Sequence, residues 1–197
     1  MHYNPYLNPY LYVVLLLLSL GILPGCGLFI AGGVATGAVI AHDSRTIGTL
    51  IEDEAIELKA GKAIAEDEEL ASSAHINVTS YNTKVLVTGE VPTEALRERV
   101  IAIVRTIEKV QDVYDEVTLA KPSSLGSRSS DGLLTTKVKT QLLRIKGFDP
   151  TRVKVVTERG VVYLMGFLNR DEGNAVAAVT RRVGGVQKVV KLFEYRG

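Results

Sequence analysis

Few side chains in this sequence can carry reaction chemistry. The chain has one cysteine, Cys26, and three histidines, His2, His42 and His75. A lone thiol forms no disulfide within the chain and no cysteine-rich metal site, and the histidines stand far apart, with no neighbouring nucleophile to activate. The glycines between positions 32 and 37 follow no predicted strand, so they form no phosphate-binding loop. We therefore expect a binding protein that is not an enzyme, with no catalytic residues, no metal site and no cofactor.

The surroundings of Cys26 suggest lipid attachment. No Lys, Arg, Asp or Glu occurs in residues 1–41, and Leu11–Leu20 is almost wholly apolar, which is typical of the core of a secretory signal. The segment that follows, Leu23-Pro24-Gly25-Cys26, resembles the lipobox of bacterial lipoproteins, in which the thiol receives diacylglycerol and becomes the mature N-terminus. The resemblance predicts a signal peptide at residues 1–25 and a lipidated cysteine with an apolar tether at residues 26–42.

Acyl chains such as palmitate would anchor the protein firmly, because each buried methylene contributes roughly 0.8 kcal/mol. In lipoprotein sorting of the enteric type, Asp after the cysteine favours the inner membrane, and Gly27 stands there in this chain. The expected location is therefore the outer membrane, facing the periplasm. The alternative is an uncleaved span, since Leu11–Ala41 exceeds the roughly 20 residues that cross a bilayer, although Pro24 and the many glycines disfavour one continuous helix.

The remaining chain contains an internal repeat. Ile76-Asn77-Val78 recurs as Val153-Lys154-Val155, and Gly89 recurs as Gly166. Each copy has the periodicity of a helix, two strands, a second helix and a last strand. The predicted elements of the first copy are 52–64, 75–81, 84–91, 93–108 and 112–119, and those of the second are 133–146, 153–158, 161–168, 170–183 and 187–195. Asn82-Thr83 and Arg159-Gly160 are the predicted tight turns.

These elements predict an α+β fold of two tandem αββαβ two-layer sandwiches, each a three-stranded sheet covered by two helices. We expect the first domain at residues 43–120, a Pro-, Gly- and Ser-containing linker at residues 121–130 and the second domain at residues 131–197. Residues 43–120 contain 8 Lys and Arg against 16 Asp and Glu, a net charge of −8, whereas residues 131–197 contain 13 against 6, a net charge of +7. The two domains therefore cannot prefer the same partner.

Three segments of this repeat carry a family resemblance. They are Val-Thr-Gly-Glu-Val at Val87–Val91, Leu-Met-Gly-Phe-Leu at Leu164–Leu168 and the closing Gly-Gly-Val-Gln-Lys-Val at Gly184–Val189. Together with the order of elements they resemble the BON domain. Two such domains behind a lipobox resemble the dual BON-domain outer-membrane lipoproteins, the division and outer membrane stress-associated lipoprotein family. The resemblance implies a phospholipid-binding or envelope-associated module without catalysis, and a role in the integrity of the outer membrane.

The basic second domain is the expected site for an anionic phospholipid membrane, since a basic residue near such a surface contributes about 1 kcal/mol. In a helical projection of its first helix, one set of side chains falls within about 80° and should face the sheet: Leu134, Val138, Leu142 and Ile145. A separate face combines an exposed leucine with cations: Leu133, Lys137, Thr140 and Arg144. We expect this face, helped by Lys139, to bind phospholipid.

Two other interpretations of these charges remain open. Leu133 could instead pack against the linker or the first domain, with the cations merely solvating the helix. The basic domain could also dock on the acidic domain, through Glu66–Glu69, Asp112, Asp115 and Glu116, or on another envelope protein, which would make the chain an interaction adaptor. Nucleic acid is not expected as a partner of an exported protein.

Overall fold

The computed structural model describes residues 46–196, which belong to one compact unit, Val39–Gly197. The first domain consists of α3 (Ile47–Ala65), α4 (Glu68–Ser73), β1 (His75–Tyr81), β2 (Lys84–Val91), α5 (Glu94–Arg105) and β3 (Asp112–Leu119). The second consists of α6 (Leu125–Leu142), the 3-10 helix η1 (Pro150–Arg152), β4 (Val153–Glu158), β5 (Val161–Leu168), α7 (Arg170–Arg181) and β6 (Lys188–Tyr195). The predicted order of elements is confirmed in both domains, with α4 and η1 added.

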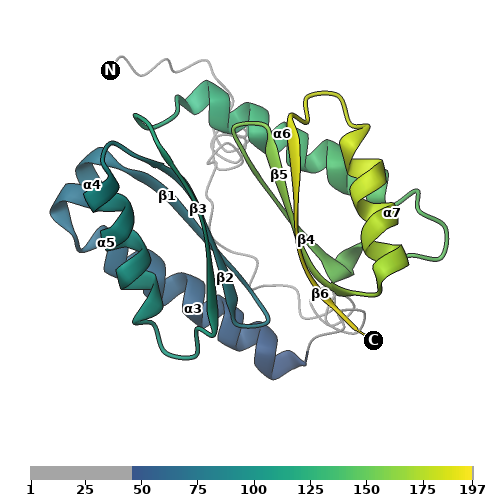
Figure 1. Ribbon diagram of the computed structural model, residues 1–197, viewed down its shortest axis with the longest axis horizontal. Coiled ribbons are helices and arrows are strands. Elements are labelled where there is room, and N and C mark those ends of the chain that lie inside the picture. The colour runs from purple at the N-terminus through teal and green to yellow at the C-terminus, as the bar shows by residue number, and fades with distance from the viewer. Residues whose placement is uncertain (1–45, 197) are drawn as a thin grey trace, which may run out of the picture. The chain divides into compact units, whose positions relative to one another are not determined.

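The two domains have the same sheet topology. The strands lie in the order β1-β2-β3 and β4-β5-β6. In each sheet the first two strands are antiparallel and the last two are parallel. A parallel pair needs a crossover connection, which α5 and α7 provide. Helices α3 and α5 cover one face of the first sheet, and α6 and α7 cover one face of the second (Figure 1), so the predicted tandem α+β fold is confirmed.

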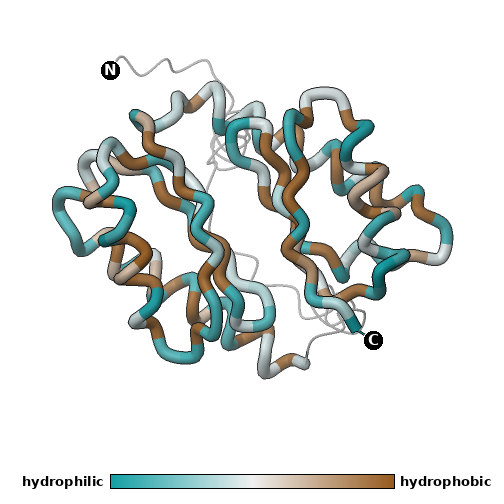
Figure 2. Tube along the Cα trace, viewed as in Figure 1, coloured by the Kyte–Doolittle hydropathy of each residue, from teal (hydrophilic) through white to brown (hydrophobic). Residues whose placement is uncertain are grey.

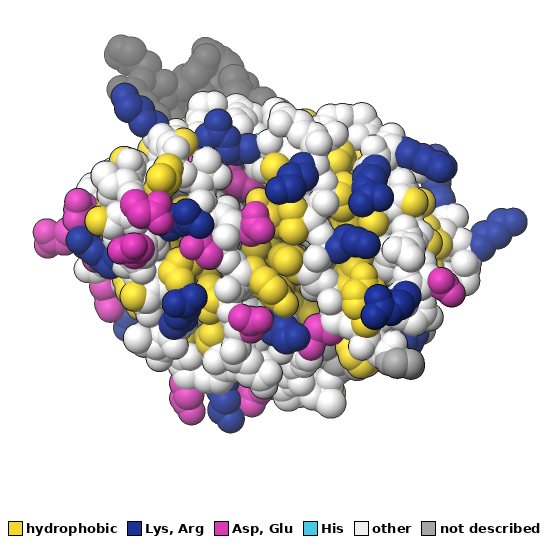
Figure 3. All heavy atoms as spheres, in the orientation of Figure 1, with side chains coloured by type: hydrophobic (Ala, Val, Ile, Leu, Met, Phe, Trp, Pro, Cys, Tyr) yellow, Lys and Arg dark blue, Asp and Glu magenta, His cyan; other side chains and the backbone are white. Residues whose placement is uncertain are grey.

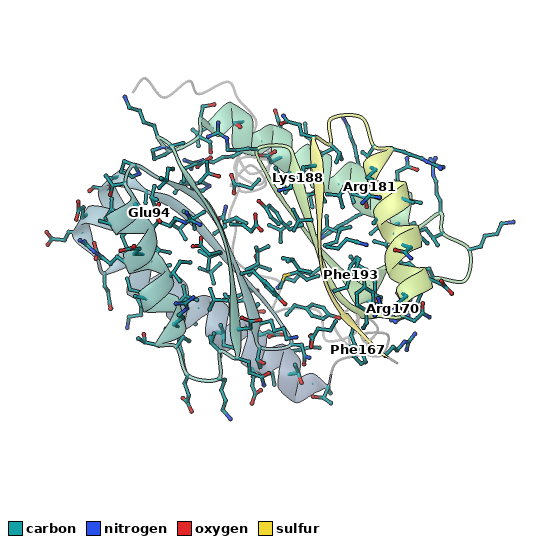
Figure 4. All side chains as sticks on the ribbon, in the orientation of Figure 1. Glu94, Phe167, Arg170, Arg181, Lys188 and Phe193 are labelled. Atoms are coloured by element: carbon teal, nitrogen blue, oxygen red, sulfur yellow. The ribbon has the colours of Figure 1, made fainter. Side chains whose placement is uncertain are left out.

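Each domain has its own apolar core between helices and sheet. In the first, Ile56 and Ala60 of α3 pack with Val100 of α5 against the strands. In the second, the predicted inward face of α6 is confirmed, because Leu134, Val138 and Leu142 are buried and Ile145 packs against them just after the helix. Phe193 lies between β6 and α7 (Figure 4) and completes this core. Among residues 46–196, no helix has both the length and the apolar character needed to cross a bilayer.

Both predicted hairpin turns are confirmed. The φ angles are 53° at Asn82, 64° at Thr83, 50° at Arg159 and 75° at Gly160. Two consecutive positive φ values are typical of the type I′ turn, whose twist matches that of the flanking antiparallel strands. Only one of the four residues is a glycine, so three side chains occupy a left-handed conformation that needs support from elsewhere in the domain.

An aspartate from the first helix of each domain supplies that support. Asp53 accepts hydrogen bonds from the N–H groups of Asn82 (2.9 Å) and Thr83 (2.8 Å) and from the Ser80 hydroxyl (2.7 Å). In the second domain, Asp131 accepts hydrogen bonds from both N–H groups of the turn, each at 2.9 Å. Sequence reasoning missed both aspartates, because each looks like an ordinary surface acid beside the apolar positions of its helix.

Part of the expected linker at residues 121–130 is helical. Helix α6 begins at Leu125, eight residues before the predicted start, because Ser124 caps it by accepting a hydrogen bond from the Ser127 N–H group at 3.3 Å. The same serines that suggested a flexible segment therefore start a helix. Helix α6 also ends at Leu142, before the predicted Lys146. In the first domain, Thr46 starts α3 at Ile47, ahead of the predicted residue 52.

The faces of the two sheets that carry no helices pack against each other. Side chains alternate along a strand, and those on this face form a third apolar cluster from both domains: Tyr81, Leu86, Tyr163 and Met165, with Tyr114, Val156, Val161, Val190 and Leu192 around them. Hydrophobic segments lie on these central strands (Figure 2). We call this contact the junction. Whether the domains touch was left open by the sequence, and the structure answers that they do.

Candidate functional site

The predicted lipid-binding residues of α6 are all exposed. Leu133, Lys137 and Thr140 lie on one side of the helix, and Arg144 lies in the turn just after it; we call these four residues the α6 face, in which Leu133 is 65% exposed. The interpretation that Leu133 packs against the linker or the first domain is therefore wrong. Lys139 is exposed as well, but at 100° per residue it lies a third of a turn away from Leu133.

Two further leucines extend the apolar part of the same exposed side. Leu143 is 69% exposed and Leu125 is also exposed. Both project about 80° from Leu133, between the α6 face and Lys139. The exposed side of α6 thus has leucines along its middle, with Lys139 on one flank and Lys137 and Arg144 on the other. Sequence reasoning missed both leucines, because Leu125 stood in the expected linker and Leu143 stands at the helix end.

A groove between α6 and α7 lies beside the α6 face. It has a volume of about 450 Å³, and its lining includes Lys137, Gln141 and Arg182. A second groove of about 510 Å³ shares Lys137 and Gly184 with the first and adds Arg159. Lys137 therefore stands between the exposed leucines and two polar grooves that each contain a second cation. An anionic group bound there would meet positive charge from more than one element.

The cations of the two domains differ in their partners. In the first domain, six Lys and Arg side chains form ion pairs: Lys59, Lys62, Lys84, Arg97, Arg99 and Lys109. Within residues 46–196, no acidic side chain lies within 4 Å of the cations on the α6 and α7 side of the second domain: Lys137, Lys139, Arg144, Arg181 and Arg182. Arg181 is at the end of α7, and Lys188 begins β6 (Figure 4).

The surface charges follow the same division. On the side seen in Figure 3, most acidic side chains lie over the first domain, and Lys and Arg side chains predominate over the second. The acidic run of the first domain has a partner within that domain, because Asp67 and Glu69 both form ion pairs with Arg99, at 3.4 and 2.9 Å. The hydrogen bond from the Leu70 N–H group, together with the pairing with Arg99, lowers the pKa of Asp67. The positive charge of the second domain is therefore the part available to an external partner.

The junction combines its apolar cluster with charged contacts at the rim. Lys154 Nζ lies 2.6 Å from a Glu57 carboxylate oxygen, and Lys84 Nζ lies 2.9 Å from Glu194. The hydrogen bond from Lys84 to Glu194 raises the pKa of Lys84. In the first pair the cation belongs to the second domain, and in the second pair it belongs to the first. Of the acidic residues proposed from sequence as a docking surface, Glu116 accepts a hydrogen bond from Tyr163 of the second domain.

Burial changes the titration of groups at the junction. Desolvation, with the nearby Glu116 carboxylate, raises the pKa of Tyr163, and desolvation raises the pKa of Glu158. Desolvation and the charge of Arg128 lower the pKa of His75. The Tyr81 hydroxyl donates to the Arg152 carbonyl at 3.2 Å, so an uncharged hydrogen bond also links the domains.

Cys26, the predicted lipidation site, lies outside the described residues, as do the whole of the expected signal peptide and of the apolar tether at residues 26–42. Within residues 46–196, His75 is the only histidine, and it lies at the junction rather than beside a candidate nucleophile.

Comparisons with known proteins agree with the internal repeat. Residues 52–121 and 130–197 match the BON domain family. The chain is 35% identical over 189 residues to the outer membrane lipoprotein DolP of Haemophilus influenzae, covering 96% of this chain and 98% of that protein. It is 37% identical over 153 residues to the 21 kDa hemolysin of Actinobacillus pleuropneumoniae, covering 78% and 79%. It is 27% identical over 158 residues to the osmotically-inducible protein Y of Escherichia coli, covering 79% and 78%.

Proposed function

The chain belongs to the dual BON-domain outer-membrane lipoproteins, and we propose that its second domain binds anionic phospholipid through the α6 face and so supports envelope integrity. The likeness to the outer membrane lipoprotein DolP extends over nearly the whole of both chains and supports an outer-membrane location and an envelope function. In this proposal the protein acts by binding, with no catalytic step and no cofactor.

The observation that carries the proposal is the set of unpaired cations around exposed leucines. Lys137, Lys139 and Arg144 have no ion-pair partner within residues 46–196, and Leu133 and Leu143 lie exposed between them. A surface that needed only solubility would not require leucines among its cations. Apolar side chains bordered by cations are the arrangement with which a helix lies in the headgroup region of a membrane.

The energies involved are sufficient for reversible membrane binding. Each basic residue near an anionic surface contributes about 1 kcal/mol, and each leucine that leaves water contributes roughly 1.5–3 kcal/mol. Three cations and two leucines would then offset much of the cost of orienting the protein. The α6–α7 groove, with Lys137 and Arg182 in its lining, offers a place for a phosphate beside the inserted leucine.

We propose that a lipid chain on Cys26 keeps this surface close to the bilayer, with the domains in the periplasm. Acylation and cleavage would leave residues 26–42 as a tether to the first domain. Mass spectrometry of the mature N-terminus from purified membranes tests this step. A diacylglycerol-modified Cys26 is expected, and an intact Met1 with a free thiol at Cys26 would contradict it.

Vesicle co-sedimentation tests the lipid-binding surface itself. The protein without residues 1–38 is expected to sediment with phosphatidylglycerol vesicles and not with phosphatidylcholine vesicles. Leu133→Glu and Lys137→Glu should each weaken this binding at least fivefold. Leu58→Glu is the matched control, because Leu58 is an exposed leucine on α3 in the acidic domain. Equal binding by all three variants would remove the α6 face from consideration.

The adaptor interpretation has support of a different kind. The domains of this chain already dock on each other, through the junction and the Lys154–Glu57 and Lys84–Glu194 pairs. That contact uses the sheets and leaves the α6 face exposed, so intramolecular docking and membrane binding are compatible. If the α6 face served an envelope protein instead, Leu133→Glu would reduce capture of that protein while leaving vesicle binding unchanged.

A further inference from the structure

Three potential metal ligands from both domains meet at one end of the junction. His75, Glu90 and Glu158 each bring one ligand atom within 4.8 Å of the other two. His75 and Glu90 face each other on β1 and β2 of the first domain, whereas Glu158 ends β4 of the second. The cluster therefore exists only because the two sheets pack together, and neither repeat alone would indicate it.

Glu90 is the strongest sign that this cluster binds a cation. Its side chain is 0% exposed, and its Oε1 atom has no hydrogen-bond partner among the described residues. The other oxygen, Oε2, accepts a hydrogen bond from the Ser123 N–H group at 3.2 Å. A buried carboxylate oxygen without a partner is costly, and sites for ions are one known reason for such a group.

The nearest cation to Glu90 is Arg159, whose Nη1 lies 3.6 Å from Oε1. This separation exceeds that of a charge-assisted hydrogen bond, and the Arg159 side chain is 48% exposed. Arg159 can therefore turn toward solvent without leaving a buried charge of its own. The guanidinium is a replaceable partner for Oε1 rather than a fixed one.

The other two ligands lie around a single amide. Asn77 Nδ2 donates to Glu158 Oε2 at 2.9 Å and lies 3.4 Å from His75 Nε2. The imidazole nitrogen and the Glu158 carboxylate thus point to the same small volume from opposite domains. A groove of about 280 Å³ is lined by His75, Asn77 and Glu158, together with Arg128 and Asp131, whereas the buried Glu90 is not part of its lining. An ion in this groove would meet His75 and Glu158, and the ligand atom of Glu90 lies within 4.8 Å of both of theirs.

We propose that His75, Glu90 and Glu158 bind Zn²⁺ and that the bound ion ties the two domains together. One imidazole and two carboxylates are ligands that suit Zn²⁺ in a four-coordinate site, with water as the fourth ligand. A 2+ ion would neutralise the two buried carboxylates, which otherwise repel each other across the junction. Because the ligands come from both domains, the ion would stabilise the docked pair more than either domain alone. The proposal does not depend on membrane binding by the α6 face.

A zinc titration of the full chain in detergent tests the site. Metal-free protein is titrated with Zn²⁺ in competition with a fluorescent chelator. One site per chain is expected, with affinity at least tenfold weaker in Glu90→Gln, in Glu158→Gln and in His75→Gln. Two control variants should bind like the parent: Glu57→Gln, which removes a junction acid that pairs with Lys154, and His42→Gln, which removes a histidine from outside the cluster.

Thermal unfolding gives a second readout. Saturating Zn²⁺ should raise the midpoint of the parent and of both controls and leave that of Glu90→Gln and Glu158→Gln unchanged. Because Gln has nearly the shape of Glu, these variants are expected to keep the circular dichroism spectrum of the parent. If the three ligand variants bind Zn²⁺ as tightly as the parent, or if the controls lose the ion equally, the proposed site is wrong.

Discussion

Replacing Asp53 with alanine should destabilise the first domain by removing the acceptor for its hairpin turn. Asp53 is buried on α3 and accepts hydrogen bonds from the Ser80 hydroxyl, the Asn82 N–H group and the Thr83 N–H group, at 2.7, 2.9 and 2.8 Å. The donor residues Ser80 and Thr83 are themselves buried. In Asp53→Ala these two donors lose their partner in a place that water reaches poorly, whereas the N–H group of the half-buried Asn82 can bind water.

The magnitude follows from the number of buried donors. Each unsatisfied buried donor costs about 1–3 kcal/mol, and two of them, reduced by water entering the space left by the side chain, give about 3 kcal/mol. For a chain of this size, 1 kcal/mol lowers the melting temperature by roughly 2–4 °C, so a decrease of roughly 6–12 °C is expected. Asp131→Ala should cost less, about 2 kcal/mol, because Asp131 accepts only from the two turn N–H groups.

Urea unfolding of the protein without residues 1–38, followed by circular dichroism, measures this cost. Glu54→Ala is the matched control, since it removes one carboxylate from the exposed side of the same helix and should change the free energy of unfolding by less than about 0.5 kcal/mol. If Asp53→Ala costs no more than Glu54→Ala, the aspartate does not hold the turn, and the explanation given for the three non-glycine residues with positive φ is wrong.

Three further predictions concern a glycine, an ion pair and the junction. In Gly89→Ala a Cβ atom would lie 1.9 Å from the His75 carbonyl oxygen, and the φ angle of this residue is +118°, so circular dichroism should show that the first domain of this variant does not fold. Gly61→Ala is the control: its Cβ atom would meet nothing within 4 Å, and the free energy of unfolding should increase by about 0.5–1 kcal/mol. The hydrogen bond from Arg152 lowers the pKa of Glu172 from 4.5 to about 2. A carboxyl group with a lowered pKa stabilises the fold at pH values above its ordinary pKa, and this stabilisation disappears as the pH falls toward 2. In urea unfolding, Glu172→Gln should therefore cost about 1–2 kcal/mol at pH 7, after allowance for the partial exposure of Glu172, and almost nothing at pH 2. Met165→Lys, which places a charge in the apolar cluster of the junction, should separate the domains and increase the radius of gyration in small-angle scattering. The scattering profile of the parent should hardly change with salt, because apolar contacts are not screened. A radius of gyration of the parent that increases with salt would show that charge alone holds the junction.

The strands could be predicted from sequence because two local signals agreed. Alternating apolar residues and the turn pairs Asn82-Thr83 and Arg159-Gly160 fixed five of the six strands to the residue, with β6 one residue shorter than predicted. Helix starts were less predictable. They depend on single capping side chains, such as Thr46 and Ser124, and the same residue types also favour loops.

The exposed residues of the candidate site could be predicted from sequence because helical periodicity alone determines which side chains of α6 are buried and which are exposed. The projection of α6 separated buried Leu134 from exposed Leu133 and Lys137, as the structure shows. Docking of the two domains was an open alternative from the sequence, but the sheet faces that form the junction could not be identified, because polar residues such as Asn77 and Glu90 alternate along β1 and β2 and made that face look solvated. Their partners come from the other domain, more than 60 residues away in sequence, and no local pattern reveals such a pairing.

The insertion of a leucine of α6 into an anionic bilayer, which we propose, can be measured directly with a fluorophore. The protein without residues 1–38 contains no cysteine, so Leu133→Cys provides a single attachment point for an environment-sensitive fluorophore, and Leu58→Cys on α3 provides the matched control. With phosphatidylglycerol vesicles, we predict a blue shift and quenching by a lipid-bound quencher at position 133 and neither effect at position 58. Identical spectra at the two positions, or a shift at position 58 alone, would contradict the proposed membrane contact.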